Sequence, residues 1–227
     1  MDKGPDSFRN AVEHCLVEVA RVEVLGNWLK LPADMVDDMK MGVFLHDFDK
    51  KQEIELFKKL KATGGPQLET IEKLAIHSNK TLKQNGYSAR VVWLASAPGG
   101  LLSELKAVKN ILDKRALSND DLAFLICHYV DDLSIGSNWI LPNRAENGQE
   151  INIIDERAAA NKKKSYNSTL NQEITKVLGI DGFDAMAEVS HLIEQRLAKA
   201  IFEQTGETVD PLKIPEFIDE KIKQASA

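Results

Sequence analysis

The stretch Met41-Gly42-Val43-Phe44-Leu45-His46-Asp47-Phe48-Asp49-Lys50 places a histidine and an aspartate directly after a run of apolar residues. Such a run predicts a buried helix, and burying an ionised carboxylate costs several kcal/mol unless a cation offsets its charge. The adjacent His46 and Asp47 are therefore a candidate metal site. On these residues alone, the alternative is a helix end whose polar groups face water. Further potential metal ligands elsewhere in the chain would favour the metal site over the exposed helix end.

The composition of the 227-residue chain is that of a soluble globular protein, with 43% hydrophobic and 28% charged residues. A net charge of -6 disfavours duplex nucleic acid as the main partner, because no excess of Lys and Arg is present to displace counterions. A small phosphorylated ligand remains compatible with a few local cations. The sequence has no leading apolar segment and no run of about 18 apolar residues, so we expect a cytoplasmic protein without a membrane partner.

Apolar residues recur at spacings of three and four along most of the chain, which predicts an all-α protein. A strand is an alternative only within 87–97, where Val91-Val92-Trp93-Leu94 has β propensity, and helices on both sides favour a helix there. The first helix is expected to be capped by Asp6 or Ser7 and to end at Leu31-Pro32. The other expected helices are about 33–47, 50–61, 68–84, 101–117, 119–133, 152–164, 168–178, 183–205 and 214–225.

A second apolar helix also carries ionisable groups. It begins near Ser118 and contains His128, Asp131 and Asp132 among residues such as Phe124-Leu125-Ile126. The Gly- and Asn-containing stretch 136–148 that follows is the longest expected loop. We therefore expect a metal-binding helical domain over residues 1–138 and a C-terminal helical extension over residues 139–227 that packs on it.

The ordered set of His14, the His46-Asp47 pair and Asp131, each on an expected helix, resembles the HD-domain superfamily of metal-dependent phosphohydrolases. Residues 46–50 look like the family's His-Asp-apolar-Gly-Lys motif, and residues 130–134 look like its Ala-Asp-x-Leu-Ser motif. The resemblance covers about residues 8–138. It implies an HD-domain-like helical bundle.

The resemblance further implies that His14, His46, Asp47 and Asp131 bind one divalent cation, with Asp131 preferred over Asp132 because it occupies the motif position. Two imidazoles and two carboxylates suit Mn, Fe, Co, Ni, Zn or Mg. The implied activity is hydrolysis of a small phosphoester, a nucleotide or nucleotide-like signal, by a metal-activated water. Asp47 would then take part in catalysis, and Lys50 would contact the phosphate.

Two departures from the family pattern leave other functions open. Asp49 replaces the motif glycine and adds negative charge near the phosphate position. Some family members hold a second metal with further histidines; His77 resembles the first of these, but Leu94-Ala95-Ser96-Ala97 stands where the next is expected. We therefore expect one metal, with His77 as a phosphate contact or proton donor. The alternatives are a non-catalytic HD-like regulatory or ligand-binding module and a di-iron oxygenase, which the missing histidine disfavours.

The roles of several residues outside the motifs also stay open. His128 is a metal ligand, a partner that orients Asp131, or a core histidine bonded to the backbone. Lys162-Lys163-Lys164 with Arg157 form either an anion site over the cleft or, as we expect, a solvated helix face. The C-terminal helices cap the cleft, form a homodimer contact, or do both. Cys15 and Cys127 lie about 100° around a helix from neighbouring histidines, so we do not expect them to be ligands.

Overall fold

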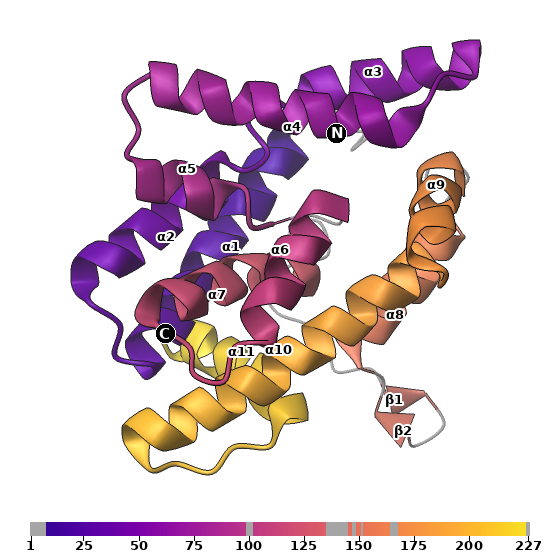
Figure 1. The fold of residues 1–227 in the computed structure, drawn as a ribbon. Coiled ribbons are helices and arrows are strands. Elements are labelled where there is room, and N and C mark those ends of the chain that lie inside the picture. The colour runs from indigo at the N-terminus through magenta and orange to yellow at the C-terminus, as the bar shows by residue number, and fades with distance from the viewer. Residues whose placement is uncertain are drawn as a thin grey trace.

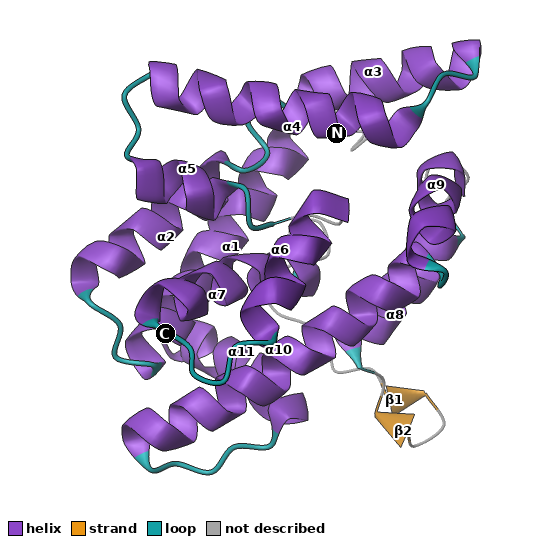
Figure 2. Ribbon diagram, in the orientation of Figure 1, coloured by secondary structure: helices purple, strands orange, loops and turns teal. Residues whose placement is uncertain are grey.

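The computed structural model describes residues 8–98, 102–134, 145–146, 149–150, 152–163 and 168–225. The described chain is almost entirely helical, as expected (Figures 1 and 2). Its first helices are α1 (Phe8–Trp28), α2 (Ala33–Leu45), α3 (Lys50–Thr63), α4 (Gln67–Gln84), α5 (Ala89–Ala95), α6 (Leu102–Leu112) and α7 (Asn119–Leu133). The later elements are β1 (Ala145–Glu146), β2 (Gln149–Glu150), α8 (Ile153–Lys162), α9 (Ser168–Leu178), α10 (Gly182–Thr205), the 3-10 turn η2 (Pro211–Lys213) and α11 (Ile214–Ala225).

Helix α7 lies at the centre of the fold. It contacts α1, α2, α5, α6, α8 and α10, and every residue from Asp121 to Leu133 is buried. A helix surrounded in this way has to be apolar on nearly all sides, which explains its run of large apolar residues. The charged residues near its end, Asp131 and Asp132, are buried as well and need partners.

The C-terminal helices share one hydrophobic core with the N-terminal helices. Ile193 and Leu197 of α10 and Ile218 of α11 belong to the same buried cluster as Leu25 of α1 and Phe124 of α7. Helix α8 packs on α7, α10 packs on α6 and α7, and α11 packs on α1. The expected boundary between residues 138 and 139 lies outside the described residues.

A glycine fixes the position of α2, the helix that leads into His46. A Cβ atom on Gly42 would lie 2.8 Å from Leu94 Cβ and 3.2 Å from the backbone nitrogen of Ala95. Only glycine therefore allows α2 and α5 to approach this closely. Leu94 itself is fully buried, so the contact belongs to the core and holds the end of α2 in place.

The expected helix over 101–117 is wrong after residue 112, because α6 ends at Leu112. Arg196 of α10 donates hydrogen bonds to the carbonyl oxygens of Leu112 and Lys114, so a tertiary partner satisfies groups that a longer helix would have bonded internally. The chain then restarts at Ser118, whose side chain forms a capping box with Asp121.

Residues Ala145–Glu146 and Gln149–Glu150 pair as a short antiparallel ladder. Its first strand lies inside the stretch 136–148 that we expected to be loop, and its second strand lies just beyond that stretch. The Asn147-Gly148 dipeptide between them is a hairpin signal that could have predicted this pairing. The strand alternative within 87–97 is wrong, because α5 is helical and is capped by Ser88. The proposed caps Asp6 and Ser7 lie outside the described residues.

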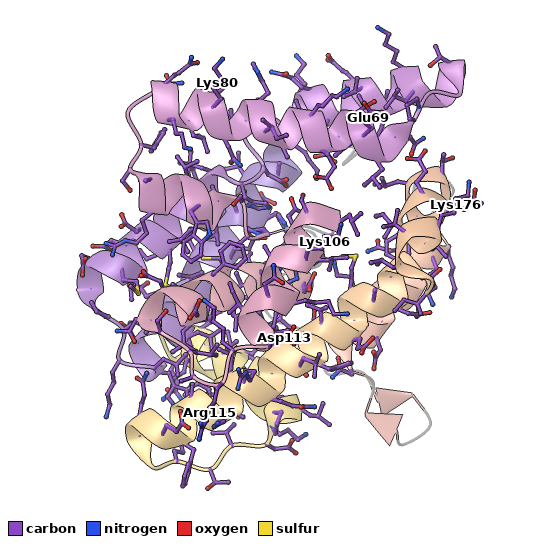
Figure 3. All side chains as sticks on the ribbon, viewed as in Figure 1. Glu69, Lys80, Lys106, Asp113, Arg115 and Lys176 are labelled. Atoms are coloured by element: carbon purple, nitrogen blue, oxygen red, sulfur yellow. The ribbon has the colours of Figure 1, made fainter. Side chains whose placement is uncertain are left out.

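Charged side chains cover the outside of the helices. Figure 3 shows labelled examples such as Lys80 on α4 and Arg115 after α6 extending from the ribbon, and both are exposed. Among the described helices, none is both long enough and apolar enough to cross a membrane.

Candidate metal centre

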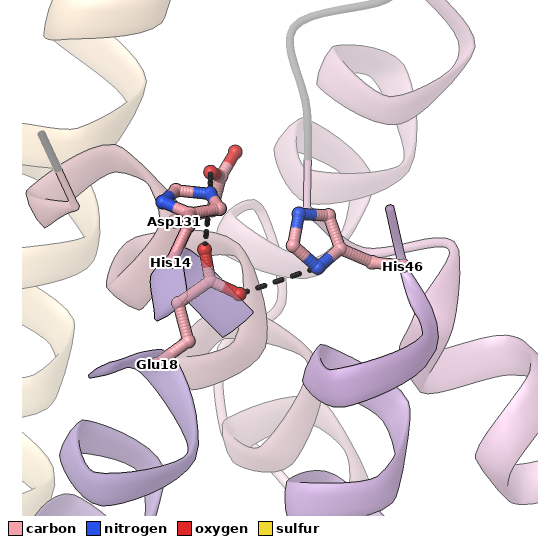
Figure 4. Close-up of side chains that lie close together, drawn as sticks. All are labelled: His14, Glu18, His46 and Asp131. Atoms are coloured by element: carbon pink, nitrogen blue, oxygen red, sulfur yellow. Dashed lines mark hydrogen bonds and ion pairs between the residues drawn. The ribbon is translucent and has the colours of Figure 1, made fainter. Parts of the chain in front are cut away.

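Helices α1, α2 and α7 bring three of the expected ligands together. His14 Nε2 lies 3.1 Å from Asp131 Oδ1. The rings of His14 and His46 have their centroids 5.6 Å apart. Figure 4 shows these three side chains turned toward one another at the place where the helices meet. Residues far apart in sequence therefore converge on one point.

A fourth side chain, Glu18, completes the group, and sequence reasoning missed it. Its Oε1 lies 2.8 Å from His14 Nε2, and its Oε2 lies 3.3 Å from His46 Nδ1. Glu18 follows His14 by four positions on α1, so the two side chains share a face of the helix. That spacing, with a carboxylate inside the apolar run Val17-Glu18-Val19-Ala20, was the available signal.

The geometry of this group suits a cation. The ligand atoms of His14, Glu18, His46 and Asp131 all lie within 4.8 Å of one another, which is about twice a metal–ligand bond of ~2.0–2.4 Å. Glu18 is fully buried, and its two carboxylate oxygens contact the imidazoles of His14 and His46. A cation bound by these groups would stabilise the buried negative charge.

Asp47 belongs to a second group of potential ligands and not to the first. That group consists of Cys15, His46 and Asp47, again with ligand atoms within 4.8 Å of one another. The expected set of His14, His46, Asp47 and Asp131 is therefore split: Glu18 takes the place of Asp47 beside the other three. The proximity of Cys15 also differs from the expectation that neither cysteine lies among the ligands.

Lys50 lies at the edge of the cluster. Its Nζ is 3.3 Å from Asp47 Oδ1 and 3.4 Å from Glu53 Oε2. Burial lowers the pKa of Lys50, but the carboxylates of Glu53 and Asp47 raise it more, so its pKa lies above the ordinary value. The ammonium group is therefore a fixed positive charge next to the centre.

His77 is not part of either group of potential ligands among the described residues. It is exposed on α4. The next residue, Ser78, donates a hydrogen bond of 2.5 Å to Asp49 Oδ2. In the part of the chain that the structure describes, no contact supports His77 as a proton donor. The hydrogen bond from Ser78 joins Asp49 to α4.

Arg157 of α8 reaches the centre from the C-terminal segment. It donates to the backbone carbonyl of Asp131, and its Nη2 lies 3.5 Å from Asp131 Oδ1. The expectation of a solvated helix face is therefore wrong for Arg157. It holds for Lys162, which pairs on the exposed side with Asp184 and Asp181. Lys164 lies outside the described residues.

Without a cation, the imidazoles of His14 and His46 carry protons at neutral pH. Burial lowers the pKa of His14, but hydrogen bonds to Asp131 and Glu18 raise it more, to about 10. Burial lowers the pKa of His46, but the nearby carboxylates of Glu18, Asp47 and Asp131 together raise it more, so its pKa lies well above the ordinary value. Burial raises the pKa of Glu18 itself. The pKa of Asp131 is well below its ordinary value despite burial, because Arg157 and His14 lie beside it. A divalent cation would replace this positive charge.

Asp131 and Asp132 face different partners. Asp132 accepts a hydrogen bond from Ser190 of α10, and its Oδ2 lies 3.5 Å from His128 Nε2. His128 Nδ1 lies 2.8 Å from the carbonyl oxygen of Ala97, and the residue is fully buried. Of the three roles left open, the structure supports a core histidine bonded to the backbone. His128 is in neither of the two ligand groups.

Comparison of the chain with models of protein families, with curated proteins and with solved structures finds no significant match. Any function of the cluster therefore has to follow from its own chemistry. Among the described residues, His14, Glu18, His46 and Asp131 form the larger of the two groups that could hold a metal ion.

Proposed function

We propose that this chain is a metal-dependent phosphohydrolase of the HD-domain type that cleaves a small phosphoester, with a nucleotide or nucleotide-like molecule as the favoured class. The observation that carries the proposal is the convergence of His14, Glu18, His46 and Asp131 from three helices within ligand distance. A set of imidazoles and carboxylates suits divalent Mn, Fe, Co, Ni, Zn or Mg. When bound, the cation polarises a phosphoryl oxygen and lowers the pKa of a coordinated water.

Two protein cations next to the cluster suit an anionic substrate. Lys50 is paired with Asp47, and Arg157 is paired with Asp131. A divalent cation bound by Asp131 would take over the charge of that carboxylate, so that Arg157 Nη2 becomes available to a phosphate. Lys50 keeps its pairing with Asp47, which lies outside this ligand set, and adds a positive charge beside it. Guanidinium groups bind phosphate oxygens through two parallel hydrogen bonds, whereas lysine acts as a point charge. In this proposal both residues orient the phosphoester and stabilise the negative charge that develops on it.

The contacts of Asp49 weaken the case for a non-catalytic module. The departure from the motif glycine raised the concern that an extra carboxylate repels the phosphate. In the structure, Ser78 donates to one oxygen of Asp49, and Gln52 Nε2 lies 3.4 Å from the other. This carboxylate therefore has partners of its own on α3 and α4, which supports a structural role for it.

A phosphoester screen tests the proposal. The reduced, full-length chain would be loaded in turn with Mn²⁺, Co²⁺, Fe²⁺, Zn²⁺ and Mg²⁺, and offered nucleoside phosphates, cyclic nucleotides and aryl phosphates. We expect release of phosphate or of a nucleotide product with at least one metal, and loss of that activity in Asp131→Asn. A cation-loaded chain that hydrolyses nothing, yet binds a nucleotide, would contradict the enzyme and favour the regulatory module.

A further inference from the structure

A second group of potential ligands lies beside the first. Asp47 Oδ1 is 3.5 Å from His46 Nε2, whereas Cys15 Sγ is 3.9 Å from the other ring nitrogen, Nδ1. The three ligand atoms of this group lie within 4.8 Å of one another. Two ligands of one cation lie no further apart than about twice a bond of ~2.0–2.4 Å. In the described chain the donors separate into two groups that share only His46, so one cation cannot take all of them.

The tautomer of His46 determines which of the two groups of ligands it can join. Its Nδ1 lies 2.6 Å from the carbonyl oxygen of Val43, which accepts the ring proton. That tautomer leaves Nε2, the nitrogen on the Asp47 side, with the free lone pair. If His46 belongs to the second group, the first retains His14, Glu18 and Asp131. Three protein ligands are typical of a catalytic metal site, because positions stay open for water and substrate.

We propose that Cys15, His46 and Asp47 form a second cation site next to the first, and that it takes a borderline metal such as Zn²⁺ or Co²⁺. A thiolate donor selects softer cations, whereas Mg²⁺ prefers oxygen ligands. Cys15 binds as the thiolate, so its proton passes to solvent when the sulfur–metal bond forms. The residue is only 4% exposed, which shields the thiolate from other reactions.

Charge is compatible with two cations when a phosphate is bound. The two groups together contain the carboxylates of Glu18, Asp47 and Asp131 and the thiol of Cys15. Ionised, these groups carry four negative charges, and Lys50 and Arg157, which pair with Asp47 and Asp131, carry two positive ones. Two divalent cations would therefore leave two positive charges, which a bound phosphate dianion would offset. The site extends the proposed metal centre and shares His46 with it, but its occupancy does not depend on hydrolysis.

A Co²⁺ titration of the reduced, metal-free, full-length chain tests the second site, because a thiolate bound to Co²⁺ gives a sulfur-to-metal charge-transfer absorption. We expect two equivalents per chain, one of which produces this band. Cys15→Ala should lose the band and one equivalent while keeping the other. Cys127→Ala is the matched control: Cys127 is equally buried but is in neither group, so both equivalents should remain.

Each other outcome contradicts the second site in a different way. One equivalent without the band would leave the first site, and with it the proposed function, intact. One equivalent with the band would put Cys15 on a single cation. Two equivalents that persist in Cys15→Ala would remove the thiolate from the site. No bound cobalt at all would overturn the proposed metal centre as well. If circular dichroism shows that Cys15→Ala does not fold, Asp47→Asn must lose the same equivalent.

Discussion

His14 and Asp131 are 117 positions apart in sequence, and His14 Nε2 lies 3.1 Å from Asp131 Oδ1. The contact joins α1 to α7, and Arg157 of α8 approaches the same carboxylate oxygen at 3.5 Å. The pair is therefore held from three helices. A site assembled from distant segments in this way forms only in the folded chain, so cation binding should stabilise the folded state.

The first prediction concerns Glu18, the ligand that the motifs did not reveal. Glu18→Gln removes the buried carboxylate that lies 2.8 Å from His14 Nε2 and 3.3 Å from His46 Nδ1. Cation affinity should fall at least tenfold, and the metal-free protein should lose thermal stability as well, because two buried imidazoles lose their anionic partner. Co²⁺ competition titration and thermal melting measure the two effects. Glu23→Gln, an exposed carboxylate on the same helix, should change neither. A loss of stability without a loss of affinity would contradict the assignment.

The second prediction concerns pH. The pKa of His14 is raised to about 10 and that of His46 is raised as well, so both imidazoles are protonated at neutral pH in the metal-free chain. A cation has to displace those protons, and each proton released adds a factor of about ten in affinity per pH unit. Affinity should therefore rise with pH between about pH 6 and 8. Calorimetry in buffers of different ionisation enthalpy counts the protons. An affinity independent of pH would show that the cation displaces no protons from the histidines.

The helices and part of the site could be predicted from the sequence. Periodic apolar residues located the helices, because each buries one face. The resemblance of His14, His46 and Asp131 to the HD-domain motifs led us to expect them together. Glu18 could have been predicted as a ligand as well, since it follows His14 by four positions inside an apolar run.

Other features depend on tertiary contacts that no local sequence pattern indicates. Arg157 looked like part of a solvated charge run, yet it bonds to the end of α7. Arg196 determines where α6 ends, from a helix more than eighty residues later. Asp47 falls in a different group from Asp131 because side-chain directions after the last turn of α2 cannot be read from spacing. His77 resembled a motif residue and is exposed.

The third prediction rests on the proposed hydrolysis. Lys50→Gln should lower kcat/KM for a phosphoester by about tenfold to a hundredfold, since a hydrogen bond to a charged group is worth about 1.5–3 kcal/mol. Bound metal should stay the same, because Lys50 is not a ligand. Lys51→Gln, on the exposed side of α3, serves as the control. Equal activity of the two variants would exclude Lys50 from phosphate binding.

The fourth prediction tests the packing that positions α2. In a free helix, Gly→Ala stabilises by about 1 kcal/mol. Gly42→Ala should instead destabilise by about 1–3 kcal/mol, because the new methyl group would lie 2.8 Å from Leu94 Cβ. Urea unfolding gives the sign directly. A more stable Gly42→Ala variant would mean that α2 and α5 do not pack as closely as described.

Metal content per chain tests the central claim most directly. The chain would be purified without added metal or chelator and analysed by plasma mass spectrometry, together with Asp131→Asn and with Asp120→Asn, an exposed carboxylate on the same helix. The metal centre predicts at least one equivalent of a divalent metal in the wild type and in Asp120→Asn, and loss of one equivalent in a folded Asp131→Asn. A chain that holds no metal after incubation with Mn, Fe and Zn salts, or an Asp131→Asn variant with unchanged content, would contradict it.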